Sequence, residues 1–574
     1  MEVNKTAAFC FFIAMFCALI AVFRIFETYH TYNQTVDEPA FIAAGMEWLS
    51  LKKYTYEHDH PPLARVAVAA GLYMKGARIP PAFYPQKDEN GQVINGHSIM
   101  WRAGNAILKF KGTYFQNLTL ARIGIIPFFI LSVFFIWLWV QKISGPVIAA
   151  TVAAIYTLLP SILGHSGIAT NDMAAVSMMT GAFLFYTCWL REPSWRMSIL
   201  LGVLTGLAAV SKFSSVVFLP AGFLFLFLLK QTVSRQGIFH FFKNNGYRNI
   251  IGQGLVGLFC ASMVVWAVYR FSVGPILTPD FYPHIERVVG GWPILKKIIY
   301  GIGSIPVPFP EFFSGFLRVY DHNRIGHLSL FFDEWHRFGV WYYFPTVFIL
   351  KTPISYLVLL GIGLFISFKR LIREKDWFSF APALYALVVL MIAMTSKINI
   401  GSRHILVIYP LASVIICFAI KHLWQPKRGR LTGRTAVVLL CGGLLFSSLS
   451  VTPDYLGYSN FLAGARPEKI LADSDIDWGQ YVTLLKQEIE ERGIDHIWVN
   501  LFSSVSPEMI GIENARLLEP GQPVTGWVAI SYFRLRREYD HGSFAWLERL
   551  TPEKIINHSI LLYKVEATDL KDSG

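Results

Sequence analysis

The chain has 574 residues, of which 54% are hydrophobic and 16% charged, and its formal net charge is +13. Soluble globular proteins carry about 25% charged residues, so this composition excludes an ordinary soluble enzyme and predicts a polytopic membrane protein with one modest soluble domain. The positive charge does not indicate nucleic-acid binding, because no stretch interleaves basic and aromatic residues as an RNA-binding sheet does. Lys and Arg are instead expected in loops on the cytoplasmic side of a membrane.

Apolar runs near the length of a membrane-spanning helix recur along the chain. Every loop that falls on the same side as the N-terminus contains Lys or Arg, as the positive-inside rule requires. We therefore expect a multi-pass protein of the plasma (inner) membrane with a cytoplasmic N-terminus. About eleven spans are predicted, at residues 7–27, 120–140, 146–163, 170–190, 197–211, 213–230, 250–271, 343–367, 379–395, 404–421 and 434–452.

The same layout places three large segments outside the cytoplasm. Two are loops, at about 28–118 and 272–342, and the third is the tail, 453–574, whose composition is that of a soluble domain. The tail contains the strand-like stretches HIWVNLF, GWVAISYF and HSILLYKVE and the helix-like stretch WGQYVTLLKQEIEERG. We therefore expect a transmembrane catalytic domain at 1–452 and a small extracytoplasmic α/β domain at 453–574.

The first outer loop carries two clusters of charged residues. Asp37 and Glu38 follow the first span in TVDEPAFIAAGMEWL, and Asp59, His60 and Arg65 stand in YEHDHPPLARVAVAAGLYMKG. The two prolines of the second cluster block a helix before them and permit a short amphipathic helix after them. The first acidic pair has a structural alternative, because acids at a helix N-terminus interact favourably with the helix dipole.

Five further polar residues lie at the outer ends of predicted spans: Asp172, Lys212, Lys351, Arg403 and His404. A charge within a span is costly unless it is paired or faces water, and Lys351, inside WYYFPTVFILKTPISYLVLL, is the clearest case. Structural alternatives exist, since Asp172 could cap a helix, Lys212 could mark a turn and Lys351 could snorkel to the interface. Their collection on one face of the membrane favours a functional site there.

The chemistry of this set of residues suits transfer of a sugar. A carboxylate takes a proton from a hydroxyl group, and cations hold a phosphate and stabilise it as it leaves. A site at membrane level suits a phosphate carried by a lipid, so we expect a polyprenyl-phosphate sugar as donor. Metal use stays open, because Asp37 and Asp172 could supply ligands to a divalent cation although no dense carboxylate cluster indicates a metal site.

DEPAFIAAG followed by DHPPLAR resembles the first outer loop of the protein O-mannosyltransferase family and, more loosely, that of the bacterial aminoarabinose transferase of lipid A. These are GT-C glycosyltransferases. WYYFPTVFILKTP, NIGSRHILVIYP and DSDIDWGQ are similar to stretches of uncharacterised bacterial members. The resemblance implies a GT-C-like fold and an inverting glycosyltransferase that uses membrane-borne polyprenyl-phosphate sugar and an extracytoplasmic protein, lipid or glycan acceptor.

By similarity, Asp37 matches the residue that acts as base near the acceptor, and Glu38 and Asp59 are the other expected catalytic residues. Arg65 stands where the family has Lys, which keeps the charge and changes the hydrogen-bond geometry. The competing interpretations are a transporter or lipid flippase, which also places charges within spans, and a membrane scaffold whose C-terminal domain binds a partner. The residues expected to bind the donor phosphate are His60, Arg65, Lys212, Lys351, Arg403 and His404, with Asp172 in the same site.

Overall fold

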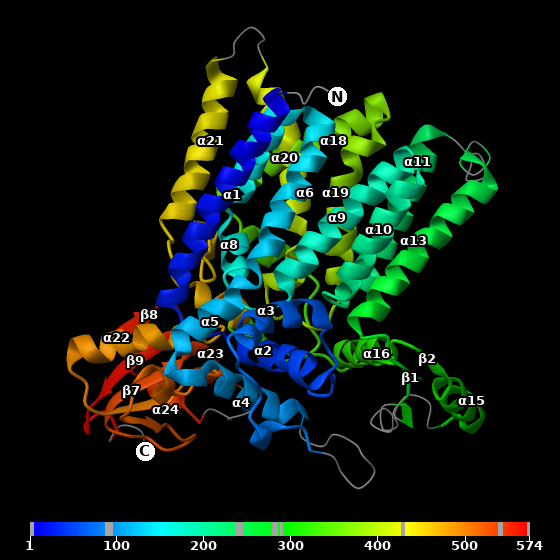
Figure 1. Cartoon of the computed structure of the whole chain (residues 1–574). Helices are drawn as coiled ribbons and strands as arrows, with labels where there is room; N and C mark the ends of the chain where they lie inside the picture. The colour runs from blue at the N-terminus through cyan, green and yellow to red at the C-terminus, as the bar shows by residue number, and fades with distance from the viewer. Residues whose placement is uncertain are drawn as a thin grey trace.

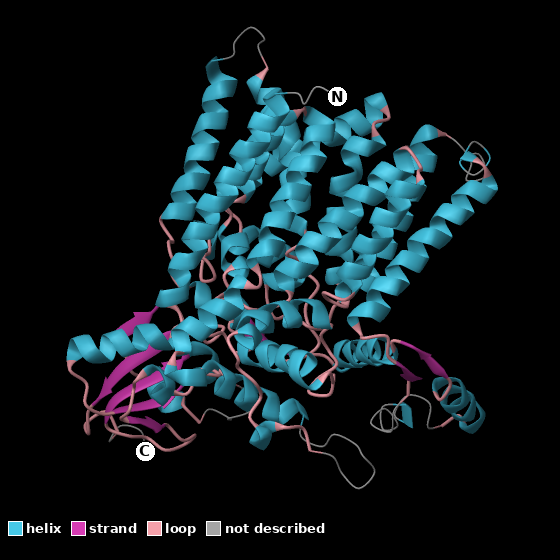
Figure 2. Cartoon of the chain, in the orientation of Figure 1, coloured by secondary structure: helices cyan, strands magenta, loops and turns pink. Residues whose placement is uncertain are grey.

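The computed structural model describes residues 5–86, 96–235, 241, 243, 245–277, 285–286, 291–425, 431–537 and 543–570. Most of the described chain is helical, and its helices form a bundle with a small β-sheet beside one end (Figures 1 and 2). The first helix, α1 (Lys5–Thr31), begins at the end of the bundle far from the sheet, whereas the C-terminus lies next to the sheet. The structure therefore confirms an α-helical polytopic protein with a small C-terminal α/β region.

The bundle confirms most of the predicted spans by position, but not their number. Among the described residues, seven stretches are long and apolar enough to cross a membrane, and an eighth is present if α7 and α8, bent by 70° relative to each other, form one span. Three further predicted spans coincide with the shorter apolar helices α10, α19 and α20. The bundle helices after α1 are α6 (Ile126–Ser144), α7 (Pro146–Tyr156), α8 (Pro160–Ser166), α9 (Asp172–Arg191), α10 (Trp195–Ala209), α11 (Ser214–Ser234), α13 (Tyr247–Val268), α18 (Ile354–Glu374), α19 (Trp377–Ala393), α20 (Ile408–Trp424) and α21 (Leu431–Leu449).

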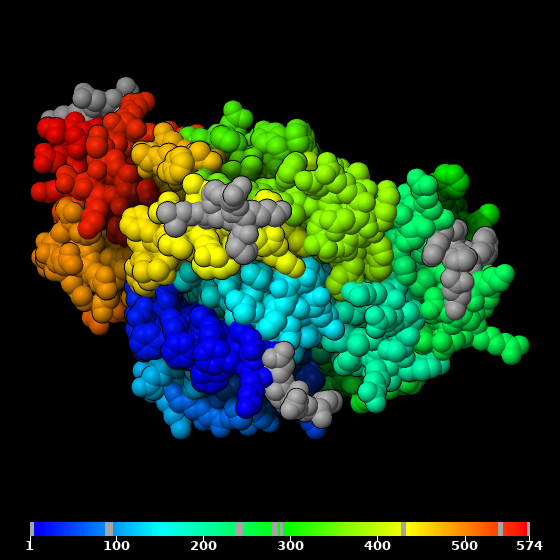
Figure 3. Space-filling model, turned by 90° about the horizontal axis from the view of Figure 1, so that it is seen from above, coloured from blue at the N-terminus to red at the C-terminus, as the bar shows by residue number. Residues whose placement is uncertain are grey.

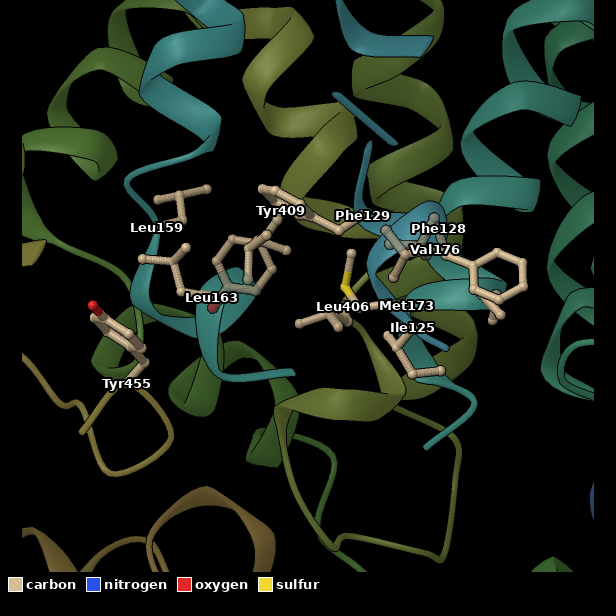
Figure 4. Packing of buried hydrophobic residues seen from close by; sticks show 14 of the residues in the cluster. Ile125, Phe128, Phe129, Leu159, Leu163, Met173, Val176, Leu406, Tyr409 and Tyr455 are labelled. Carbon is tan, nitrogen blue, oxygen red and sulfur yellow. The ribbon is translucent and has the colours of Figure 1, made fainter. Parts of the chain in front are cut away.

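The apolar core of the bundle includes the side chains at the break between α7 and α8. Leu159 and Leu163 at this break belong to the same buried cluster as Tyr409 of α20, and Figure 4 shows the three side chains near one another. All seven residues of α8 are buried. The break is therefore filled by side chains, as expected for a close-packed interior.

The predicted first outer loop forms a layer of short helices at the sheet-proximal end of the bundle (Figure 1). The prediction of a helix after the two prolines is confirmed by α3, which begins at Pro62. Neighbouring helices touch α2 through glycines: a Cβ at Gly45 would lie 1.9 Å from the carbonyl oxygen of Arg65, and one at Gly104 would lie 2.0 Å from that of Pro39. The contact between Gly104 and Pro39 fixes the start of α2, where the acidic pair lies. The helices are α2 (Glu38–Met46), α3 (Pro62–Met74), α4 (Gly96–Leu108) and α5 (Tyr114–Ile123).

In its described part, the predicted second outer loop contains two antiparallel strand pairs and two helices. The pairs are β1 (Val273–Pro275) with β2 (Pro306–Pro308) and β3 (Ser329–Phe331) with β4 (Glu334–His336), and the helices are α15 (Pro293–Gly303) and α16 (Pro310–Ile325).

The span predicted at 343–367 is wrong as a single helix. The structure divides it into α17 (Tyr343–Leu350) and α18, and Lys351 lies in the break between them. The physical reason is Pro353, which disfavours the helical conformation at the residue before it and cannot donate a backbone hydrogen bond. Lys351 is therefore at a helix end and not within a span.

The C-terminal region confirms the predicted strands and helix. Its five-stranded sheet has the order β6-β5-β7-β9-β8, with β5 parallel to β6 and β7, and β9 antiparallel to β7 and β8. Seen from the far end of the bundle, the C-terminal residues lie beside the helices that carry the blue and yellow colours (Figure 3). The elements are α22 (Val482–Arg492), β5 (Ile497–Asn500), β6 (Ala515–Leu517), β7 (Gly526–Ser531), α23 (Tyr532–Leu535), α24 (Ala545–Glu548), β8 (Lys554–Ile556) and β9 (Ile560–Val565).

Candidate active site

A cavity of about 510 Å³ lies where the bundle, the predicted second outer loop and the C-terminal region meet. The predicted first outer loop lines it with Asp37, and the segment before α20 lines it with Arg403. The C-terminal region supplies Asp473 and Trp478, both from the DSDIDWGQ stretch. With the predicted second outer loop, residues from four distant parts of the sequence therefore face one space.

Asp37 and Arg403 form an ion pair at this cavity. Asp37 occupies the N-cap position of α2, but its side chain makes no capping hydrogen bond. Instead its Oδ2 accepts a hydrogen bond of 2.9 Å from Nη1 of Arg403, whose guanidinium lies 4.3 Å from the centroid of the Trp478 ring. Contact with both a carboxylate and an aromatic face orients the guanidinium. The side chains of Asp37 and Arg403 remain 25% and 12% exposed, so the pair is accessible from the cavity.

The C-terminal segment is attached to the residues next to both partners of this pair. The backbone N–H of Val36, next to Asp37, donates to the carbonyl of Trp478 at 2.9 Å. The backbone N–H of Ser402, next to Arg403, donates to Oδ1 of Asp475 at 2.8 Å. The C-terminal region is therefore part of the candidate site.

A second ion pair lies behind the first. Nζ of Lys212 lies 2.6 Å from Oδ1 of Asp172 and donates to the backbone carbonyl of Arg403 at 3.4 Å. Asp172 is thus engaged with Lys212, and the N-cap of α9 is Asn171. This pairing satisfies two buried charges and joins α9 to the segment that carries Arg403.

Two histidines lie close enough to these charges to be affected by them. Burial, followed by the charges of Lys212 and Arg403, lowers the pKa of His404 well below its ordinary value. Burial also lowers the pKa of His60, with Asp59 and Asp37 opposing the shift. Both imidazoles are therefore expected to be neutral at neutral pH, and their binding of the donor phosphate stays a prediction. We call the seven predicted residues that come together here the membrane-side cluster: Asp37, Asp59, His60, Asp172, Lys212, Arg403 and His404.

Glu38, predicted as catalytic, is buried in a different set of contacts. Its side chain is 0% exposed and accepts two hydrogen bonds of 2.9 Å from Arg122. The backbone N–H groups of Thr35 and Ala169 also donate to it, at 2.7 and 2.8 Å. These contacts indicate that Glu38 positions the loop that carries Asp37. Arg122 is not among the predicted site residues, and its sequence signal is a charge within a predicted span.

Arg65 does not reach the cavity either. It is 2% exposed and forms an ion pair with Glu57, which also lies 2.8 Å from Nδ1 of His60. The guanidinium lies 5.3 Å from the centroid of the Phe41 ring in α2. These contacts favour a role for Arg65 in holding the second cluster of the loop against α2, and the sequence analysis did not identify Glu57.

Lys351 is likewise 2% exposed and contacts the backbone. Its Nζ donates to the carbonyl of Leu456 at 2.7 Å and to the carbonyl of Asp475. Lys351 is buried inside the protein, so its amine does not snorkel to the interface. The contacts favour a role in anchoring the C-terminal segment, and binding of the donor phosphate by Lys351 stays a prediction.

Two titratable groups of the cavity were not identified from the sequence. Burial raises the pKa of Asp473 to about 7, with Asp37 adding to the shift and Arg403 opposing it. Burial, followed by the charges of His322 and Arg403, lowers the pKa of His327 to about 4. The charge of Asp473 therefore changes near neutral pH, whereas His327 is neutral there.

Metal-ligating side chains are not clustered in the part of the chain that the structure describes. Within the ranges given above, no group of three or more His, Cys, Asp or Glu side chains is placed to hold a metal ion. Asp37 and Asp172, the expected ligands, are paired with Arg403 and Lys212. Each carboxylate therefore has a side-chain cation as its partner, and a divalent metal would compete with Arg403 and Lys212 for it.

One family model matches part of the chain. Residues 114–243 match the family described as dolichyl-phosphate-mannose-protein mannosyltransferase. Over these residues the match confirms the predicted resemblance to the GT-C mannosyltransferase family and, with it, the prediction of a glycosyltransferase. A comparison with curated proteins found no match.

The chain is also similar to solved structures of two membrane glycosyltransferases. One is ArnT from Cupriavidus metallidurans bound to undecaprenyl phosphate, with 10% identity, a TM-score of 0.48 and coverage of 97% of this chain and 98% of that chain. Another is the Archaeoglobus fulgidus oligosaccharyltransferase in the apo form, with 12% identity, a TM-score of 0.47 and coverage of 94% and 71%. The same archaeal enzyme, AglB, in complex with an inhibitory peptide and a dolichol-phosphate has 10% identity, a TM-score of 0.47 and the same coverage. At these values the similarity assigns neither a substrate nor a site residue to this chain.

Proposed function

We propose that the chain is an inverting glycosyltransferase of the plasma (inner) membrane that moves a sugar from a polyprenyl-phosphate donor to an acceptor outside the cytoplasm. The observation that carries this proposal is the Asp37 carboxylate, which makes no capping bond and contacts Arg403 at a large cavity. The family match supports the donor class, because the family's description includes a dolichyl-phosphate sugar. In this proposal the N-terminus is cytoplasmic and the cavity lies on the outer side.

Asp37 serves as the general base of the proposed reaction. The acceptor hydroxyl oxygen bonds to the anomeric carbon of the sugar while Asp37 takes the hydroxyl proton. The bond between the anomeric carbon and the phosphate oxygen breaks, and its electron pair stays on the phosphate. Attack opposite the leaving group inverts the anomeric centre. Arg403 orients the Asp37 carboxylate for this proton transfer.

Lys212 and Arg403 are the cations best placed to act on the leaving phosphate. Negative charge grows on the phosphate as the sugar departs, so a cation nearby stabilises the transition state more than the bound donor. Both side chains belong to the membrane-side cluster, and Lys212 is 14% exposed. A partly dry site strengthens such charge interactions.

The transporter or flippase interpretation has less support. Such proteins bind substrate near the middle of the bilayer, in broken helices that line a cavity. The broken pair α7 and α8 packs into the core, and no residue of α8 lines the large cavity. That cavity lies instead against the C-terminal region, which a transporter does not require.

The test compares Asp37→Asn with Asp495→Asn, an exposed control of the same chemistry outside the cavity. Cells that lack the protein receive the wild type or either variant, and mass spectrometry measures the glycans of the cell envelope. Wild type and the control should restore a sugar-bearing species, whereas Asp37→Asn should lower its rate of formation about 10²–10⁴-fold, because a general base is lost. The variant must also insert and melt as the wild type does.

Binding of undecaprenyl phosphate to the purified protein in nanodiscs provides an independent measurement. The wild type should bind it, and Asp37→Asn should retain that binding, since the base is not the phosphate ligand. Full transfer by a well-folded Asp37→Asn variant would contradict the catalytic assignment. Unchanged glycans in cells without the protein, together with no binding of undecaprenyl phosphate, would contradict the proposed function as a whole.

A further inference from the structure

The rest of the cavity contains a composite surface that the membrane-side cluster does not account for. One part comes from β4 and the residue after it, and the other from the loop after β5, from α23 and from the residues after α23 in the C-terminal region. We call this surface the outer wall, and its residues are Trp335, Arg337, Phe502, Phe533, Arg534 and Arg537.

The two parts of the outer wall are held together by polar contacts outside the cavity. Oδ1 of Asp333 accepts a hydrogen bond of 2.6 Å from the Tyr532 hydroxyl and lies 2.9 Å from Nε of Arg536. The indole N–H of Trp335 donates to the backbone carbonyl of Arg536. The β3–β4 hairpin is thereby fixed to α23, so the wall is a preorganised surface.

Three aromatic rings of the outer wall form a continuous apolar face. The Phe533 ring centroid lies 5.3 Å from that of Trp335 and 4.6 Å from that of Phe502, with the two Phe planes inclined at 37°. Cavities that hold small ligands combine such apolar faces with a few polar groups that fix orientation. The C–H face of a sugar ring packs on an aromatic surface of this kind and leaves its hydroxyl groups free for polar contacts.

The charged groups of the cavity favour an anion. Three arginines of the outer wall and Arg403 face two carboxylates, those of Asp37 and Asp473. His327 also lines the cavity, and because its imidazole is neutral near pH 7 it does not change this balance of charges. Guanidinium groups bind carboxylate and phosphate with two parallel hydrogen bonds, and a positive cavity concentrates anions. An uncharged acceptor would gain nothing from this arrangement.

We infer that the outer wall is the acceptor subsite and that the acceptor is an anionic saccharide, whose ring packs on Trp335, Phe502 and Phe533 while its carboxylate or phosphate meets the arginines. This inference rests on the proposed function, which makes the cavity the place of transfer. The phosphate of the lipid donor is a second source of the same anionic chemistry, and the experiment separates the two.

The experiment measures ligand binding to the full-length protein in nanodiscs by calorimetry or saturation-transfer NMR. The probes are glucose, glucuronate, glucose 6-phosphate and undecaprenyl phosphate. The variants are Arg337→Gln, which changes an exposed side chain, and Arg537→Gln, with Arg516→Gln on β6 outside the cavity as the matched control. Phe533→Leu tests the aromatic face.

The two anionic sugars should bind more tightly than glucose. Each arginine variant of the outer wall should weaken their binding about tenfold, the effect of losing one hydrogen bond to a charged group. Arg516→Gln should not change it, and undecaprenyl phosphate should bind equally to all of these variants. Phe533→Leu should weaken both anionic sugars, while an acidic peptide without sugar should bind poorly to the wild type.

Three results would overturn the inference. Equal binding of glucose and glucuronate would show that the subsite does not select an anionic acceptor. Loss of undecaprenyl phosphate binding in the wall variants would show that the arginines bind the phosphate of the donor. Binding of an acidic peptide as tight as that of the anionic sugars would indicate that the acceptor is a protein and not a saccharide. Failure of the proposed function has a different signature, in which the wild type binds the anionic sugars but not undecaprenyl phosphate.

Discussion

Replacing Glu38 by Gln is expected to destabilise the protein much more than replacing its neighbour Asp37 by Asn. The Glu38 carboxylate is 0% exposed and accepts four hydrogen bonds, two from Arg122 and two from backbone N–H groups. Gln keeps the size of the side chain but turns one acceptor oxygen into an NH₂ group that faces donors. It also leaves the guanidinium of Arg122 buried without a counter-charge.

The size of this effect follows from burial. Removing one partner of a buried ion pair costs about 3–5 kcal/mol. Arg122 keeps its bonds to the carbonyls of Tyr32 and Asn33, at 3.1 and 2.8 Å, so we expect the lower end of that range for Glu38→Gln. Asp37 is 25% exposed and its pair with Arg403 is open to the cavity, so Asp37→Asn should cost about 1 kcal/mol or less.

Unfolding of the purified protein by SDS titration, followed through tryptophan fluorescence, measures the difference between the two variants. The double variant Glu38→Gln with Arg122→Met should recover part of the loss, because it removes the unpaired charge as well. A loss below about 1 kcal/mol for Glu38→Gln, or a larger loss for Asp37→Asn, would refute the argument that Glu38 is a positioning residue.

Three further outcomes are expected. Lys351→Met should lower the melting temperature, because each carbonyl that loses its amine partner costs about 1–3 kcal/mol. Unchanged stability with lost undecaprenyl phosphate binding would contradict the anchoring role and place Lys351 at the phosphate. The carboxyl of Asp473, whose folded-state pKa is raised to about 7, is neutral below that pH and charged above it. Glucuronate binding should therefore weaken as pH rises through about 7, and Asp473→Asn should lack this dependence; identical pH profiles for the two proteins would contradict it. Reporters fused after Trp424 and after Asp569 should give opposite topology signals, and matching signals would mean that the order of spans is wrong.

Local sequence patterns account for most of the elements. The apolar runs predicted helices at nearly all bundle positions, and the alternating stretches of the tail predicted β5, β7 and β9. These predictions succeed because apolar periodicity and turn residues act over a few residues. The span around Lys351 failed because the apolar run continues through the break, and only the position of Pro353 marks it.

By itself the sequence determined the class of the protein, which follows from its composition, and predicted that charged residues gather on one face of the membrane, which follows from the cost of charges in lipid. Only the tertiary structure decided which of these residues meet. Asp37 and Glu38 are adjacent in sequence, yet a helical start directs one to Arg403 at the cavity and the other to Arg122 in the interior. The outer wall had no sequence signal, because its aromatic and basic residues come from segments far apart and share a surface only after the β3–β4 hairpin packs against α23.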